Sequence, residues 1–209
     1  MINFQQAEKM VADLEIYAVK NGRVEGTWNL YSGHVYNVAK IAKKIADFIG
    51  MDSKRASVMA LLHDIGKIDE GLVSRFHGII GYEMLKDKDY DIARICLTHM
   101  FPNNIIPSWE SIGTRLFFNN KKDYDFTSQY LQDNPPNDYD LLIQLSDTLG
   151  KYNKFATIEE SIIEYRTRHN IKESDGIVQN AIASRTKVKQ YFDKKIGQDV
   201  YDFLEIKHK

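Results

Sequence analysis

Residues 61–68 read Leu-Leu-His-Asp-Ile-Gly-Lys-Ile, and this stretch places two polar residues inside an apolar run. The leucine and isoleucine neighbours predict that His63 and Asp64 lie in the interior of the fold. Because a buried polar group without a partner is costly, this pair needs one. An imidazole nitrogen and two carboxylate oxygens are suitable metal ligands, so we consider a metal ion first.

Apolar residues recur at helical spacing on both sides of this stretch. The clearest stripe lies in Tyr31–Gly50, and the helix that carries His63 is expected to start at Asp52 or Ser53 and to reach Lys67. The predicted helices cover residues 4–20, 31–50, 53–67, 73–86, 89–99, 108–119, 138–152, 158–170 and 175–203. No alternating strand pattern is found. We therefore predict an all-α, single-domain helical bundle over residues 1–209, in which C-terminal helices (156–205) pack on a motif-bearing core (about 30–150).

Length and charge limit the classes of function. A chain of 209 residues suits one sizeable domain. Its net charge of -1 creates no bulk field that favours nucleic acid or an anionic membrane, so we expect neither as a partner. No apolar run approaches the roughly 20 residues of a membrane helix. The N-terminus lacks a signal core, and the single Cys96 fits a reducing compartment, so we expect a cytoplasmic protein. No pattern indicates an oligomeric state.

Four of the six histidines extend apolar helix stripes, namely His34, His63, His77 and His99. One histidine on such a stripe is ordinarily a core residue, but four on different predicted helices favour a common site. Asp147, in the mostly apolar turn Leu145–Leu149, is a further carboxylate that would need a cation or several donors. His169 and His208 lie in charged surroundings and are expected to be solvated.

These residue types predict a binuclear metal site. Neutral imidazole and carboxylate suit Fe, Mn, Ni, Co or Zn. Four histidines and two aspartates are more than one metal needs beside substrate and water, so we expect two divalent ions. Asp64 is the expected bridge because it lies beside His63. Two ions about 3.5–4 Å apart can hold a phosphoryl group and ionise a water molecule.

The order of these residues resembles a known family. His34, His63-Asp64 and Asp147 are similar to the H…HD…D signature of the HD-domain metal-dependent phosphohydrolase superfamily, and His77 and His99 add the H…HD…H…H…D pattern of its binuclear subset. The resemblance covers about residues 30–150 and implies an all-α bundle. The family's ligand pattern implies one metal on His34, His63, Asp64 and Asp147 and a second on Asp64, His77 and His99.

The resemblance also implies a function. It implies a phosphomonoesterase or phosphodiesterase that acts on a nucleotide or a related small phosphate ester, with a metal-activated water as nucleophile. Asp64 and Lys67 would be catalytic residues. Lys67, three residues after Asp64, would face the site from the same helix and neutralise a phosphate oxygen. Arg75, two residues before His77, is a second candidate substrate contact, although a surface position is common for arginine.

Two alternatives use the same ligands. HD-fold di-iron oxygenases carry this set, and some of them place a lysine soon after the HD pair. A non-catalytic metal-containing sensing module would keep the metals for structure. Oxygen consumption by an iron-loaded sample would favour the oxygenase, and full metal occupancy without turnover would favour the sensing module.

Overall fold

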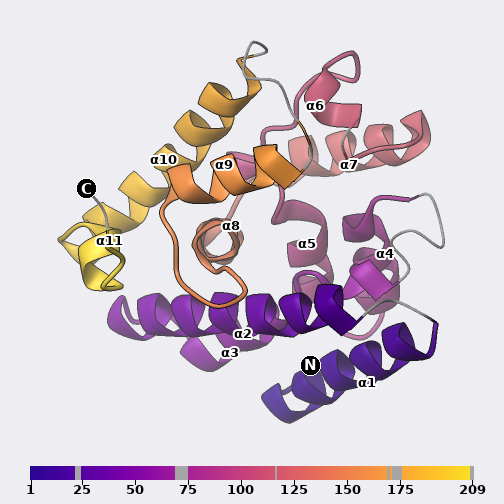
Figure 1. Ribbon diagram of the computed structural model, residues 1–209, viewed down its shortest axis with the longest axis horizontal. Coiled ribbons are helices and arrows are strands. Elements are labelled where there is room, and N and C mark those ends of the chain that lie inside the picture. The colour runs from indigo at the N-terminus through magenta and orange to yellow at the C-terminus, as the bar shows by residue number, and fades with distance from the viewer. Residues whose placement is uncertain (22–24, 69–74, 116, 169, 171–175, 208–209) are drawn as a thin grey trace.

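The computed structural model describes residues 1–21, 25–68, 75–115, 117–168, 170 and 176–207, and its regular elements there are helical (Figure 1). The α-helices are α1 (Phe4–Lys20), α2 (Glu25–Phe48), α3 (Ser53–Leu62), α4 (His77–Leu85), α5 (Tyr90–Thr98), α6 (Ile112–Arg115), α7 (Lys121–Asp133), α8 (Asp138–Leu149), α9 (Ile158–Arg168), α10 (Ile177–Ile196) and α11 (Val200–Phe203). Two 3-10 turns are η1 (Ile65–Ile68) and η2 (Pro102–Asn104). The all-α prediction is confirmed.

The main core lies between α2, α3 and α8, and α9 and α10 cover α8. Figure 1 shows α2 crossing the molecule with α3 behind it and α8 nearly end-on at the centre. The apolar stripe predicted for α2 is buried, with Val35, Val38 and Ile41 fully inside. A second apolar cluster joins α4 and α5 to α7 through Phe76, Ile79, Leu97, Phe101, Phe118 and Leu131. The two clusters therefore hold the elements around the His63-Asp64 stretch on both sides.

Several predicted helix boundaries were wrong. The helix predicted over residues 31–50 begins six residues earlier, at Glu25, and the helix predicted over 138–152 ends at Leu149. The helix that carries the motif ends at Leu62, so His63 and Asp64 form a turn and Lys67 lies on η1 rather than on α3. The predicted helix 108–119 is reduced to α6, and α7, for which no helix was predicted, follows it. The predicted helix 175–203 is interrupted at Gly197, whose φ of 82° caps the C-terminus of α10.

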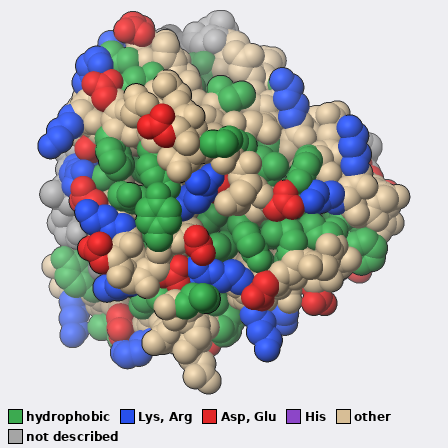
Figure 2. All heavy atoms as spheres, turned by 180° about the vertical axis from the view of Figure 1, so that it is seen from behind, with side chains coloured by type: hydrophobic (Ala, Val, Ile, Leu, Met, Phe, Trp, Pro, Cys, Tyr) green, Lys and Arg blue, Asp and Glu red, His purple; other side chains and the backbone are tan. Residues whose placement is uncertain are grey.

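Some predictions fall on residues that the structure does not describe. The predicted start of a helix at Val73 is one of them, and so are the positions of His169 and His208. No helix in the described part of the chain is long and apolar enough to cross a membrane. Figure 2 shows the face opposite that of Figure 1, where apolar side chains are interleaved with charged side chains of both signs.

Gly66 explains why the polypeptide turns after His63-Asp64. A Cβ atom at Gly66 would lie 1.9 Å from the carbonyl oxygen of His77 and 2.5 Å from the backbone nitrogen of Gly81. Only glycine therefore allows η1 to approach α4 this closely. The approach brings the motif turn against the start of the helix that carries His77.

Asp89 joins the N-terminus and α3 to the start of α5. Its carboxylate accepts hydrogen bonds from the backbone nitrogen of Ile2 at 2.8 Å and from Arg55 Nη1 at 2.9 Å, and Arg55 Nη2 makes a further bond to it. Burial alone would raise the pKa of Asp89, but the bonds from Arg55 and Ile2 outweigh it and lower the pKa. Asp89 is therefore ionised in the folded protein at neutral pH.

We expect Asp89→Asn to lower the free energy of unfolding by about 3 kcal/mol at neutral pH, because Arg55 would stay buried without its carboxylate. A carboxyl group whose pKa is lower in the folded state stabilises the protein above its unfolded pKa, about 3.9, and loses this contribution as the pH falls through the folded value. The difference between variant and wild type should therefore shrink in acid. Urea unfolding of both proteins near pH 7 and near pH 3 measures it.

Asp91→Asn is the matched control, because Asp91 also contacts Arg55, at 3.2 Å, but its side chain is 67% exposed. Exposed ion pairs contribute about 1 kcal/mol or less, so the control should unfold almost as the wild type does. A deficit in Asp89→Asn that is equally large at both pH values would contradict the assignment.

Candidate metal centre

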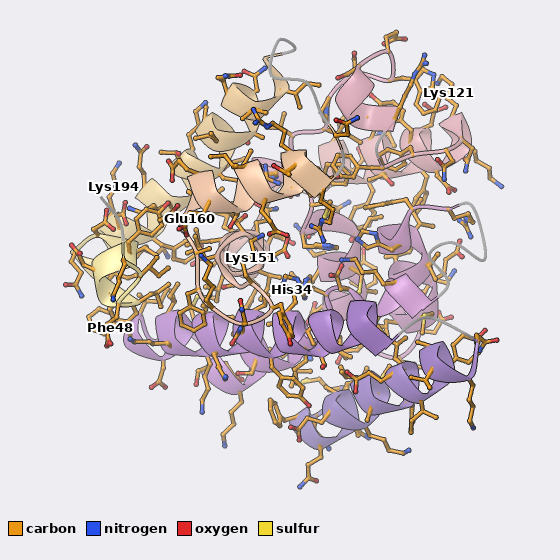
Figure 3. The ribbon with its side chains drawn as sticks, viewed as in Figure 1. His34, Phe48, Lys121, Lys151, Glu160 and Lys194 are labelled. Atoms are coloured by element: carbon orange, nitrogen blue, oxygen red, sulfur yellow. The ribbon has the colours of Figure 1, made fainter. Side chains whose placement is uncertain are left out.

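The six predicted ligands lie together, four of them buried and His34 and Asp147 partly exposed. They come from α2 (His34), the turn after α3 (His63 and Asp64), the start of α4 (His77), the end of α5 (His99) and α8 (Asp147). They form three overlapping groups in which the ligand atoms lie within 4.8 Å of one another: His34–His63–Asp64, His63–His99–Asp147 and Asp64–His77–His99. Figure 3 shows His34 near the centre of the molecule, between α2 and α8. The sequence prediction that these residues converge is thus met by the geometry.

Asp64 lies between two pairs of histidines. Its Oδ1 atom is 3.2 Å from His77 Nε2 and 3.3 Å from His99 Nε2. Its Oδ2 atom is 3.5 Å from His63 Nε2 and 3.6 Å from His34 Nε2. Because each oxygen faces a different pair, the carboxylate is placed to serve two cations at once.

Asp147 belongs to the side of the cluster that contains Asp64 Oδ2. Its Oδ1 atom lies 3.1 Å from His34 Nε2 and 3.4 Å from His63 Nε2. Lys67 Nζ donates to Asp64 Oδ2 at 2.5 Å. Lys67 thus reaches the cluster, as predicted, although it does so from η1 and not from a continuous α-helix.

Hydrogen bonds to backbone carbonyls orient three of the imidazoles. His34 Nδ1 lies 2.6 Å from Gly150 O, His63 Nδ1 lies 2.6 Å from Ala60 O, and His99 Nδ1 lies 2.9 Å from Cys96 O. A carbonyl oxygen only accepts, so each Nδ1 carries the proton. In the neutral ring this leaves the Nε2 lone pair directed at the centre, which is the arrangement of a histidine metal ligand.

Gly150 makes the bond to His34 possible. A Cβ atom at Gly150 would lie 2.8 Å from the backbone nitrogen of Val38, so a side chain there would push the end of α8 away from α2. With glycine, the chain after α8 passes close to α2, and the Gly150 carbonyl reaches the imidazole. The side chain of Asn37 supports the same turn by donating to Lys151 O at 2.6 Å.

Two buried polar atoms at the centre have no hydrogen-bond partner among the described residues: His63 Nε2 and Asp64 Oδ1. The side chains of His63 and Asp64 are 0% and 1% exposed, so bulk water does not solvate them. Buried polar atoms without partners are rare and mark sites where an ion or a water belongs. The donor set and these two atoms therefore fit bound divalent cations.

The electrostatics of the cluster favour positive charge at its centre. Burial would raise the pKa values of Asp64 and Asp147, but Lys67 and the histidines outweigh it, and both pKa values lie well below the ordinary range. Burial would lower the pKa of His63, yet Asp64 and Asp147 raise it. Burial lowers the pKa of His99. Two ionised carboxylates and a neutral His99 are the protonation states in which these groups bind metals.

Arg75, the other predicted substrate contact, pairs with groups outside the cluster. Its guanidinium donates to Glu83 at 2.8 Å and to Asp123 at 3.3 Å. These ion pairs connect the start of α4 to α7. A contact between Arg75 and a substrate stays a prediction.

Sequence reasoning missed two basic residues near Asp147, Lys151 and Arg185. The charge of Asp147 acts on both side chains, and both have pKa values lowered by burial. Lys151 follows Asp147 by about one helical turn, a spacing that could have drawn attention to it. Arg185 lies on α10, far along the chain, and no sequence signal connects it with the motif.

Comparison with known proteins adds a family match. The model of a family described as the HD domain matches residues 31–151, more than half of the chain. Over 77 residues, 36% of this chain, the sequence is 39% identical to the tRNA (cytidine(56)-2'-O)-methyltransferase of Picrophilus torridus. This chain spans 22% of the length of that relative. No solved structure matches significantly.

Proposed function

This chain belongs to the HD-domain family, and on that basis we propose that it is a metal-dependent phosphohydrolase acting on a nucleotide or a related small phosphate ester. The observation that carries the proposal is the placement of Asp64, whose two carboxylate oxygens face separate histidine pairs. Two divalent ions bound there would lower the pKa of a water molecule and hold phosphoryl oxygens. The partial match to a methyltransferase contributes no activity to the proposal, because it covers so little of that protein.

The proposed ligands divide into two sets that share Asp64. His34, His63, Asp64 and Asp147 would hold the first ion, and Asp64, His77 and His99 would hold the second. The carbonyl bonds to Nδ1 of His34, His63 and His99 fix these rings before an ion binds. The conformational entropy of these metal-ligating side chains is therefore lost during folding and not when the ions bind.

The cluster is closed on one side and open on the other. His63, His77 and His99 are buried, whereas the side chains of His34, Asp147 and Lys67 are 18%, 21% and 32% exposed. A substrate would enter past these three side chains. In the proposal, the buried side excludes water and the exposed side receives the phosphate group.

Lys67 is the proposed donor to a phosphate oxygen, because its ammonium group already touches the shared carboxylate at 2.5 Å. We expect Lys67→Met to retain its metal and to lower kcat/KM for a phosphate ester about 100-fold, the effect of losing one charged donor at a transferring phosphoryl group. Steady-state kinetics together with metal analysis of the same preparation measures this. Wild-type kinetics in Lys67→Met would exclude the role, and loss of metal would make Lys67 a structural residue of the site.

A panel of phosphate esters tests the proposed reaction. Metal-loaded wild-type protein would be assayed with p-nitrophenyl phosphate, its bis-ester and a set of nucleotides, and oxygen consumption would be followed in parallel. Release of phosphate or nitrophenol without oxygen uptake supports a phosphohydrolase, and the preferred ester separates phosphomonoesterase from phosphodiesterase. Oxygen uptake without hydrolysis would point to the oxygenase alternative, and full metal occupancy without any turnover would contradict an enzyme of either kind.

A further inference from the structure

Lys151 and Arg185 are two basic residues on segments that pack around the metal centre. Lys151 follows α8, and Arg185 lies on α10, outside the matched family region of residues 31–151. α10 packs on α8, which carries Asp147, and on η2, which follows His99 closely in the chain. Figure 3 shows Lys151 near His34, in agreement with the bond between His34 Nδ1 and the adjacent Gly150 O. Both residues thus come from elements that border the centre.

Arg185 differs from Arg55, Arg75 and Arg94 in its partners. Arg55, Arg75 and Arg94 each donate to aspartate or glutamate side chains at hydrogen-bond distance. Arg185 Nη1 donates to the carbonyl oxygen of Ala181 on its own helix at 3.3 Å. Among the described residues no carboxylate forms an ion pair with it, although the charge of Asp147 acts on it. A partly buried guanidinium group that forms no ion pair with a carboxylate has N–H donors available for an anion.

Lys151 is a second basic residue, and it directly follows Gly150, whose carbonyl oxygen bonds His34. Its nearest carboxylate is that of Glu164, at 3.7 Å, and the Glu164 side chain is 54% exposed. Burial lowers the pKa of Lys151 and outweighs the attraction of Asp147 and Glu164, while Arg168 and Arg185 add repulsion. Burial also lowers the pKa of Arg185. Two positive charges in a partly buried site lower the stability of the fold. Ionisable groups with shifted pKa values are common at functional sites, and here an anionic ligand would compensate both charges.

We propose that Lys151 and Arg185 form an anion subsite next to the metal centre, which binds a second phosphate group of the substrate. The inference rests on the proposed phosphohydrolase function and narrows its substrate class. A simple monoester would occupy the metals and Lys67 alone. A substrate with two or more phosphate groups, such as a nucleoside diphosphate, a nucleoside triphosphate or a small bisphosphate, would also contact Lys151 and Arg185.

Binding of two inorganic anions tests the subsite without requiring turnover. Isothermal titration of the metal-loaded protein, in buffer that contains the same metal, compares pyrophosphate with orthophosphate for wild type, Arg185→Gln and Lys151→Gln. We expect each variant to bind pyrophosphate about tenfold or more weakly and orthophosphate within about twofold of wild type, since a charge-assisted hydrogen bond is lost from the second phosphate alone. Arg185→Lys should recover part of the loss because it restores the charge without the planar fork.

Lys187→Gln is the matched control, because Lys187 is an exposed lysine on the same helix. It should bind pyrophosphate as the wild type does. A thermal melt of each variant checks the fold: relief of charge repulsion predicts that Arg185→Gln melts at or above the wild-type temperature in the absence of anion, and that added pyrophosphate raises its melting temperature less than that of the wild type.

The outcomes separate this inference from the proposed function. Equal affinity of the wild type for the two anions, or unchanged pyrophosphate binding in both Gln variants, would overturn the subsite even if the wild type hydrolyses monoesters. If Arg185→Gln fails to fold, the result with Lys151→Gln decides. Absence of hydrolysis by the wild type would overturn the proposed function, and the anion titrations would still show whether the two residues bind a second phosphate.

Discussion

Asp64→Asn should remove both metal ions from the protein and reduce phosphate-ester hydrolysis about 1,000-fold or more. Asp64 Oδ1 faces His77 and His99, and Oδ2 faces His34 and His63, so this carboxylate is the one group that both proposed ligand sets share. An amide supplies one weaker oxygen ligand and no charge. The loss of several kcal/mol of metal-dependent stabilisation corresponds to a rate effect of about this size.

The control for this variant is Asp52→Asn. Asp52 caps α3, the helix that leads into the motif, by accepting a hydrogen bond from the backbone nitrogen of Arg55 at 2.9 Å. Asparagine caps helices about as well as aspartate does, so this variant should keep its metal and its activity. Metal analysis and initial rates for both variants complete the comparison. An Asp64→Asn protein with two bound ions, or with wild-type hydrolysis, would show that Asp64 is not the shared ligand.

His77→Ala should release one metal ion and keep the other. His77 belongs to the group that contains Asp64 and His99, and it is absent from the two groups that contain His63. The ligands of the first ion are therefore intact in the variant. We expect the metal content to fall from two ions per chain to one and hydrolysis to fall about 100-fold, because the phosphoryl group would lose one of two cations.

Lys86→Ala is the matched control, because Lys86 is an exposed residue at the other end of α4. It should retain both ions. Two ions in His77→Ala would remove His77 from the ligand set. A single ion in the wild type would give His77 and His99 a role in the substrate site or the core instead of in metal binding.

The sequence predicted the fold class and the members of the cluster for one physical reason. His34, His63, His77 and His99 each continue an apolar helix stripe, and a polar residue on such a stripe must lie in the interior with a partner. Helical periodicity thus indicated burial without a tertiary structure. The resemblance to the HD domain, which rests on the order of the same residues, is confirmed by the family match over residues 31–151.

Other features depend on tertiary contacts that local sequence does not encode. α3 stops at Leu62, and at Gly66 the chain approaches His77 and Gly81 closely; nothing in the apolar pattern marks that contact. α7 was missed because its sequence is mostly polar and its buried residues include Asp123 and Thr127. Only the structure reveals that α10, which carries Arg185, packs on α8 and η2 beside the cluster.

We propose that this chain hydrolyses phosphate esters with the help of metal ions held by the six-residue cluster. The most direct measurement is metal analysis of the wild-type protein purified without chelator, followed by hydrolysis assays on that sample before metal removal, after it and after metal is restored. We expect two divalent ions per chain, hydrolysis that disappears when the ions are removed, and recovery of hydrolysis when they are restored. A metal-free preparation that hydrolyses the same esters at an unchanged rate would contradict it.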